Sequence, residues 1–359
     1  MAIWEGASIL VIRLSSMGDV VRLLPSLQAL RGSGASRVDL TVEDRFASLL
    51  DLFPVAHGVV VYPRKHPGTP WRHPVAWVSA MAAYRGALRA ARYDLALDLH
   101  GILRSALVAR MSGAKETAGY AGGFGKEGSH LFYDRRVVPG PSPRISRYER
   151  YAGALQAMGL PEPGRDYLAP RLPGEAAADV DAFLASAGLT GRPYLFAFLG
   201  TSRAQAHKRW PLVRFLELAR AVHERLGLPT LLGWGPEEAD LVRALPAQEG
   251  ITAIPYWDLP RLVEVVRRSA AFVGADTGAM HLAALMGVPT VAVLGPTDPV
   301  LNRPFGGKAR VVFHEGIRRA CPGQGCDHRD CMARIGAAQV LSALSEVLGG
   351  QEDHHHDPT

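Results

Sequence analysis

Short apolar runs alternate along this chain with longer amphipathic stretches, and this alternation constrains the fold more than any other feature. Runs such as SILVIRL at Ser8–Leu14, LALDL at Leu95–Leu99 and YLFAFL at Tyr194–Leu199 have the length of buried strands. Longer segments with helical periodicity lie between such runs. Strands that alternate with helices form βα units around a mostly parallel sheet, so we expect an α/β protein.

The alternation occurs in two stretches, separated by a segment of different composition. Further strands are predicted at Val38–Val42, Val59–Tyr62, Pro229–Gly233, Ala271–Gly274 and Thr290–Leu294, and helices at Val20–Arg31, Pro74–Arg92, Leu212–Leu226 and Met280–Met286. Between residues 139 and 175 the chain is rich in proline, glycine and arginine, which is typical of a domain boundary. We expect an N-terminal domain of residues 1–170, a C-terminal domain of residues 171–350 and a disordered tail of residues 351–359.

Composition excludes several classes of protein. With 359 residues, of which 48% are hydrophobic and 21% charged, the chain is unlike a disordered, collagen-like or coiled-coil sequence. No apolar run reaches the ~20 residues that span a bilayer, and the N-terminus lacks a signal-peptide pattern, so we expect a cytoplasmic protein. The sequence contains neither a Walker motif nor a GxGxxG after a strand, which disfavours a kinase or a dinucleotide-dependent dehydrogenase.

Positive charge is concentrated in the first half of the chain. Residues 1–170 contain 21 Lys and Arg against 14 Asp and Glu, a net charge of +7, whereas residues 171–359 contain 19 against 20, a net charge of −1. This asymmetry favours an anionic partner for the first domain, such as a phosphorylated lipid, a membrane face or a nucleic acid. An arginine-rich surface that meets only solvent explains the same count.

The first candidate site follows the first strand, in the segment SSMGD at residues 15–19. A loop after a parallel strand faces the crevice where α/β sheets bind ligands, and the next helix offers free N–H groups to an anion. Gly18 permits a tight turn or the close approach of a ligand. Asp19 is either the N-cap of the helix or a general base directed into the crevice.

A second candidate site has the same order of strand, turn and helix, in GADTGAMH at residues 274–281. Asp276 ends the strand, where a carboxylate is placed to hold a sugar hydroxyl. Thr277 fits a helix N-cap, and Gly278 removes side-chain bulk where a diphosphate would meet the helix N-terminus. His281 lies about one turn into the helix. A well-capped helix without a ligand accounts for the same residues.

A third candidate site lies in the loop after the strand Tyr194–Leu199. Hydroxyls and a lysine at the end of a strand are groups that bind phosphate, because lysine supplies a compact charge and hydroxyls supply donors. The candidates here are Thr201, Ser202 and Lys208, and Pro211 fits the first position of the next helix. The companion loop GWGPE ends on Glu237, a candidate contact to a nucleobase or ribose. A solvated loop is the alternative.

Three cysteines, Cys321, Cys326 and Cys331, lie close together with His328. An odd number of cysteines does not fit a disulfide framework, and we expect them to stay reduced. Three thiols and an imidazole are zinc ligands, but the spacing differs from the usual CxxC pairs, so we expect no metal site. His354, His355 and His356 fit a frayed end.

Taken in order, these segments resemble the heptosyltransferases of lipopolysaccharide core synthesis, glycosyltransferase family nine, over nearly the whole chain. The resemblance is carried by ILVIRLSSMGDVVRLLPSLQALR, YDLALDLHGILRSALVAR, HKRWPLVRFLELA, GADTGAMHLAALMGVPTVAVLGPTDP and the cysteine-bearing CPGQGC and CM. It implies the GT-B architecture, two Rossmann-like domains with parallel sheets facing a central cleft, with the donor on the C-terminal domain.

The resemblance also implies an activity. The enzyme would move a heptose from ADP-heptose to the inner core, to Kdo on lipid A or to a heptose already added, with inversion and with no required metal or other cofactor. The implied partners are a nucleotide-sugar donor, a phosphorylated lipid-linked acceptor and the cytoplasmic face of the inner membrane, with no nucleic acid.

Site residues follow from the resemblance position by position. Asp19 matches the acidic residue proposed as the base that deprotonates the acceptor hydroxyl. The implied donor-binding residues are Thr201, Ser202, Lys208, Glu237, Asp276, Thr277, Gly278 and His281, and the implied acceptor-binding residues are Ser16, Gly18, Arg22, His100 and Arg104. Arg22 and His100 depart from the family, which frequently has histidine and glutamine at these positions.

The predicted helix Pro74–Arg92 carries two stripes at helical spacing. One consists of Arg85, Arg89 and Arg92, and the other of Trp77, Met81, Tyr84 and Leu88. We expect the apolar stripe to pack in the core, with a peripheral membrane contact by part of the helix as a hypothesis.

Three other functions of the protein stay open: a relative that uses another nucleotide sugar or glycan acceptor, a sugar-nucleotide epimerase, and a non-catalytic binding protein.

Overall fold

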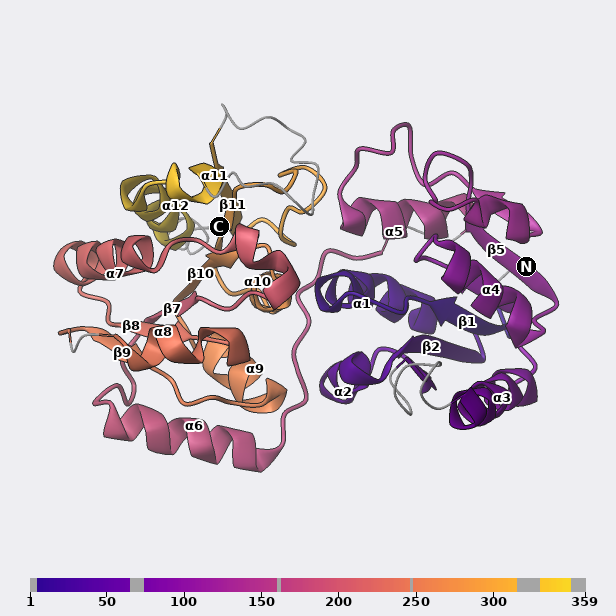
Figure 1. Cartoon of the computed structure of the whole chain (residues 1–359), viewed down its shortest axis with the longest axis horizontal. Helices are drawn as coiled ribbons and strands as arrows, with labels where there is room; N and C mark the ends of the chain where they lie inside the picture. Colours follow the sequence, from indigo (N-terminus) through magenta and orange to yellow (C-terminus); the bar gives the residue numbers. More distant parts are fainter. Residues whose placement is uncertain (1–4, 65–73, 160–162, 246–247, 315–329, 350–359) are drawn as a thin grey trace, which may run out of the picture. The chain divides into compact units, whose positions relative to one another are not determined.

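The structure is a computed structural model that describes residues 5–64, 74–159, 163–245, 248–314 and 330–349 (Figure 1). The chain divides into two compact units, Met1–Asp166 and Tyr167–Thr359. Each unit contains a six-stranded sheet. No helix in the described ranges is both long enough and apolar enough to cross a membrane.

The N-terminal unit is a parallel sheet in the order β3-β2-β1-β4-β5-β6. Its elements are β1 (Ser8–Ile12), α1 (Met17–Gly32), β2 (Arg37–Glu43), α2 (Asp44–Leu52), β3 (Gly58–Tyr62), α3 (Pro74–Ala90), β4 (Leu95–Asp98), α4 (Leu103–Ser112), β5 (Glu116–Tyr120), η1 (Ser129–Phe132), β6 (Arg135–Val137) and α5 (Arg147–Ala157). This is the Rossmann strand order, in which the direction of strand addition reverses between β1 and β4.

The C-terminal unit repeats the same order as β12-β11-β10-β7-β8-β9, also parallel. Its elements are α6 (Gly174–Ser186), β7 (Leu195–Phe198), η2 (Arg203–Lys208), α7 (Leu212–Leu226), β8 (Thr230–Gly233), η3 (Pro236–Glu238), α8 (Ala239–Arg243), β9 (Ile251–Ala253), α9 (Leu259–Arg267), β10 (Ala271–Ala275), α10 (Gly278–Leu285), β11 (Thr290–Leu294), β12 (Ala309–Phe313), α11 (Asp330–Ala333) and α12 (Ala337–Gly349). Here the reversal falls between β7 and β10.

The central strands form because their side chains are apolar on both faces. Ile9–Ile12 of β1 and Ala271–Val273 of β10 are fully buried, as expected for parallel strands covered on both sides. The predicted helix Leu212–Leu226 and strand Thr290–Leu294 match the structure residue for residue. Helices α1 and α10 begin before their apolar periodicity does, since Ser16 and Thr277 are their N-caps.

The segment between residues 139 and 175 contains a helix that the sequence analysis did not predict. Ser146 is the N-cap of α5, and its hydroxyl accepts a hydrogen bond from the N–H of Glu149 at 3.2 Å. Tyr151 is among its buried residues, and the helix packs against α1. Proline, glycine and arginine around this short amphipathic stretch hid its periodicity.

The boundary between the units falls after Asp166, whereas the sequence analysis placed it after residue 170. Leu168 belongs to the C-terminal unit because its N–H donates to the carbonyl of Leu285 at 2.9 Å. The ring of Tyr167 also packs edge-on against Phe305 of that unit. Composition alone did not reveal these contacts. The predicted tail of residues 351–359 lies outside the described residues.

Candidate active site

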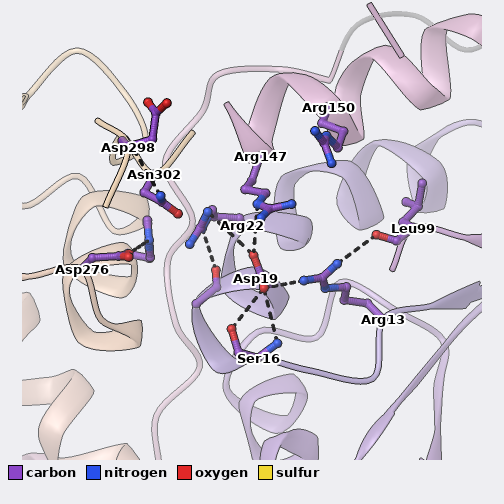
Figure 2. A network of polar contacts seen from close by, with 12 residues as sticks. Arg13, Ser16, Asp19, Arg22, Leu99, Arg147, Arg150, Asp276, Asp298 and Asn302 are labelled. Carbon is purple, nitrogen blue, oxygen red and sulfur yellow. Dashed lines mark hydrogen bonds and ion pairs between the residues drawn. The ribbon is translucent and has the colours of Figure 1, made fainter. Parts of the chain in front are cut away.

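The first candidate site lies at the strand-order reversal of the N-terminal unit, in the turn between β1 and α1 (Figure 2). Ser16 is the N-cap of α1 and Asp19 is its third residue. The Ser16 hydroxyl donates to Asp19 Oδ2 at 3.1 Å, and the Ser16 N–H points to the same oxygen at 3.5 Å. The interpretation of Asp19 as the N-cap is therefore wrong, since Asp19 is the second member of a capping box.

Three arginines surround the Asp19 carboxylate. Arg13 forms a close ion pair with Oδ2, while Arg22 Nη1 and Arg147 Nε lie 3.7 and 3.8 Å from Oδ1. Burial alone would raise the pKa of Asp19, but these guanidinium groups hold it well below its usual range. Asp19 is therefore ionised at every physiological pH, with its side chain still 16% exposed.

Arg13 links this turn to the neighbouring strand and helix. Its Nη1 donates to the carbonyl of Leu99, just after β4, at 3.2 Å. Its guanidinium also lies over the ring of Tyr151 on α5, 5.8 Å from the centroid. Arg13 is 5% exposed, an unusual burial for an arginine. Neither Arg13 nor Arg147 was predicted from the sequence. The available signal for Arg13 was an arginine inside the buried apolar run SILVIRL.

The turn after β4 holds His100 at the same reversal point. Asp98 Oδ1 accepts the N–H groups of His100 and Gly101 at 2.8 and 3.1 Å, and the Tyr133 hydroxyl donates to Oδ2 at 2.6 Å. Burial, followed by the charge of Arg13, lowers the pKa of His100 to about 3. His100 is therefore a neutral imidazole beside the Asp19 cluster.

Of the other predicted acceptor residues, Gly18 and Arg22 lie in the Asp19 turn, whereas Arg104 does not. Arg22 is 5% exposed, and its Nε donates to the Gly18 carbonyl at 3.1 Å, so Gly18 and Arg22 belong to the Asp19 turn. Arg104 on α4 lies apart from it. Its Nη2 is 3.6 Å from the buried carboxylate of Glu43, which also binds Arg45 and Arg64.

Three of the predicted donor residues meet at the strand-order reversal of the C-terminal unit, after β7 and β10. Lys208 Nζ lies 2.9 Å from Asp276 Oδ2, and His281 Nε2 lies 3.4 Å from Asp276 Oδ1. His281 is fully buried on α10, and Asp276 is 8% exposed. Asp276 and His281 of one sequence motif and Lys208 of another therefore form a single polar cluster.

Thr277 and Gly278 begin α10 at this cluster. Thr277 is the N-cap, as predicted, and its Oγ1 accepts the N–H of Met280 at 3.4 Å. The first N–H groups of a helix have no intrahelical partner and attract anions. Lys208 and the α10 N-terminus together provide what a diphosphate requires.

A buried carboxylate joins the loops after β7 and β8. Glu238 is fully buried; its Oε1 pairs closely with Arg209 and accepts the Thr201 N–H at 3.3 Å. Arg209 Nε donates to Thr201 Oγ1 at 3.2 Å. Glu237, which the sequence analysis selected, is exposed, as is Ser202. A sequence does not reveal which of two adjacent glutamates is buried.

Two smaller predictions concern Pro211 and the cysteines. Pro211 is the N-cap of α7 rather than its first residue. Cys331 is buried in the core of the C-terminal unit with Met332, whereas Cys321, Cys326 and His328 lie outside the described residues. Among the residues that are described, no three His, Cys, Asp or Glu side chains are grouped as metal ligands.

Solved structures share this architecture. A glycosyltransferase family 9 structure from Veillonella parvula superposes with a TM-score of 0.78 at 22% identity, covering 96% of this chain and 98% of that one. The Escherichia coli heptosyltransferase WaaC with ADP gives a TM-score of 0.70 at 24% identity, covering 95% and 99%. Two Rossmann units, each built on a six-stranded parallel sheet, place the chain in the GT-B fold class.

Sequence comparison then identifies the family. The model of glycosyltransferase family 9 (heptosyltransferase) matches residues 81–329. Lipopolysaccharide heptosyltransferase 1 of Pseudomonas aeruginosa is 31% identical over 87% of this chain and 84% of its own length. The Escherichia coli K12 enzyme of the same name is 30% identical over 83% and 91%. The chain belongs to glycosyltransferase family 9.

Proposed function

We propose that the protein transfers a heptose from ADP-heptose to the inner core of lipopolysaccharide, on Kdo or on a heptose already present, with inversion of the anomeric carbon. Family membership and the names of the relatives support the activity. Solved relatives carry ADP and ADP-2-deoxy-2-fluoro heptose, which supports an adenine nucleotide sugar as donor.

The C-terminal unit binds the donor in this proposal. Lys208 and the N-terminus of α10 contact the diphosphate, and Asp276 exchanges its ion pair with Lys208 for a contact to the sugar. Negative charge grows on the diphosphate as the bond from C1 to the leaving oxygen breaks. A fixed cation and oriented N–H groups therefore stabilise the transition state more than the ground state.

The N-terminal unit supplies the base. As the acceptor oxygen attacks C1, its proton becomes acidic and passes to an Asp19 carboxylate oxygen, and ADP leaves from the opposite face of the sugar. The arginines keep Asp19 ionised but also make it a weak base. Proton transfer therefore follows the attack rather than preceding it.

The acceptor is a phosphorylated, lipid-linked core sugar. A protein that modifies it works in the cytoplasm and contacts the inner membrane peripherally. The positive charge of the N-terminal unit favours such an anionic acceptor. The predicted acceptor residues Ser16, Gly18, Arg22 and His100 lie around the same turn as Asp19, whereas Arg104 marks a second basic cluster on Glu43.

One observation carries the proposal: Lys208, Asp276 and the α10 N-terminus meet at one reversal point, and Asp19 lies in its arginine cluster at the other. ADP release by the pure protein tests it, with ADP-heptose and a heptose-deficient core lipid. We expect ADP to be released only when the acceptor is present. We expect no nucleotide release when a UDP-sugar is supplied in place of ADP-heptose. Turnover of the donor without acceptor would contradict glycosyl transfer and favour an epimerase.

A further inference from the structure

Helix α3, which is labelled in Figure 1, exposes an unusually apolar face. Of its 17 residues, only Tyr84 and Leu88 are buried. Val75 is 81% exposed and Val78 is 59% exposed. A helix on a protein surface normally presents polar residues to solvent, so these valines require another explanation.

The two faces of α3 follow from helical spacing. The inner stripe is Trp77, Met81, Tyr84 and Leu88. Tyr84 and Leu88 belong to the core of the N-terminal unit, Met81 packs against it, and Trp77 is partly buried. The outer stripe repeats at the same intervals and is exposed at every position: Val75, Val78, Ala82, Arg85 and Arg89. The outer stripe is therefore apolar in its first half and basic in its second.

The charges on the outer stripe are not balanced by the protein. Helix α3 contains no acidic residue. Within the ranges that the structure describes, neither Arg85 nor Arg89 forms an ion pair, and Arg89 Nε only donates to the carbonyl of Met111 at 3.4 Å. Two exposed guanidinium groups beside exposed valines match the surface of an anionic bilayer, which offers phosphates above an apolar interior.

We infer that the outer stripe of α3 docks the protein on an anionic lipid bilayer. Val75 and Val78 insert among the headgroups, and Arg85 and Arg89 bind lipid phosphates. The net charge of +7 on residues 1–170 adds long-range attraction to such a surface. The inference rests on the proposed function in one respect: a lipid-linked acceptor gives the enzyme a reason to bind the membrane.

Cosedimentation of the full chain with vesicles tests the surface directly. We expect binding to phosphatidylethanolamine vesicles that contain phosphatidylglycerol, weakened by salt, and little binding to phosphatidylcholine alone. The double variant Val75→Asp/Val78→Asp lowers the partition coefficient by at least ~10-fold, because two carboxylates replace the inserting side chains. Arg85→Glu weakens binding to the anionic vesicles only.

Helix α7 of the C-terminal unit supplies matched controls. Val213 is the second residue of α7, as Val75 is of α3, and it is 58% exposed. Arg220 is exposed on the same helix. Val213→Asp and Arg220→Glu repeat the chemical changes elsewhere and are expected to leave vesicle binding unchanged. Equal losses in the controls would overturn the assignment to α3.

Activity assays separate this inference from the proposed function. The Val75→Asp/Val78→Asp variant should transfer sugar normally to a soluble, deacylated core acceptor and poorly to the same acceptor anchored in vesicles. Normal vesicle binding without any ADP-heptose activity would contradict the proposed function alone. Absence of vesicle binding by the unmodified protein would refute the inference, as would a dimer that the double variant dissociates with no change in vesicle binding.

Discussion

Lys208 Nζ lies 2.9 Å from Asp276 Oδ2, so the cation proposed to bind the donor diphosphate is held by a carboxylate from the adjacent strand loop. The pair is largely buried, with side-chain exposures of 16% and 7%. Asp276 thereby positions the ammonium group at the N-terminus of α10 before any donor binds.

Replacement of Lys208 by Met should weaken ADP binding. Charge-assisted hydrogen bonds contribute ~1.5–3 kcal/mol, so we expect a loss of about 10- to 150-fold in affinity. Isothermal titration with ADP measures it, and adenosine, which lacks phosphates, serves as the control ligand. An equal loss for adenosine would mean that the variant disturbs the loop rather than the diphosphate contact.

Asp19→Asn should slow transfer strongly while donor binding persists. General base catalysis contributes typically ~10²–10⁴-fold, and we expect a fall in kcat of that size with an unchanged Kd for ADP. The variant also removes the carboxylate that pairs with the buried Arg13, so its melting temperature should fall. Asp51→Asn, the same change at an exposed carboxylate of α2, is the control; wild-type turnover in Asp19→Asn would assign Asp19 a structural role alone.

Protonation of Asp19 should not reduce the activity of the wild-type protein at mildly acid pH. Its pKa in the folded protein is held far below the ~3.9 of an unfolded chain, so the carboxylate stays charged across about pH 5 to 8. Arg147→Gln removes one of the three cations, so the pKa of Asp19 should rise, and loss of kcat/KM through protonation of Asp19 should begin at a higher pH than in the wild-type protein. A profile that is identical in both proteins would contradict control of Asp19 by Arg147.

The lowered pKa of Asp19 also makes the free energy of unfolding depend on pH. A carboxyl group with a lowered folded pKa stabilises the protein fully above its unfolded pKa, and this contribution is lost as pH falls toward the folded pKa. We expect the free energy of unfolding in urea to decrease below about pH 4, and to decrease less steeply in Arg147→Gln. Parallel curves for the two proteins would argue against the ion pair.

The adjacent residues Glu237 and Glu238 allow a matched comparison in the C-terminal unit. Glu238→Gln removes the charge of a fully buried carboxylate and breaks its ion pair with Arg209, whose side chain is 25% exposed, so the melting temperature should fall. Glu237→Gln changes an exposed side chain, and its stability should not change. Weaker ADP binding by Glu237→Gln at constant stability would support the nucleotide contact expected of Glu237.

Much of the candidate site could be predicted because its residues lie in strand-turn-helix segments. Thr277 as the α10 N-cap and the strand before it were both visible in the sequence, since caps and buried strands depend on local chemistry. Arg147 could not be found that way. It lies 128 residues after Asp19 (147 − 19), on a helix whose surroundings have the composition of a linker.

The sequence by itself determined the α/β class, the alternation in two halves, the turns that carry polar residues and the family. These depend on periodicity, capping and motif, which are properties of neighbouring residues. Only the tertiary structure decided that Arg13 after β1, Arg22 of α1 and Arg147 of α5 meet at Asp19. It also decided that Lys208 pairs with Asp276 and that Glu238 rather than Glu237 is buried. Burial and charge pairing depend on which segments the fold brings together across long stretches of chain, and a one-dimensional pattern does not contain that information.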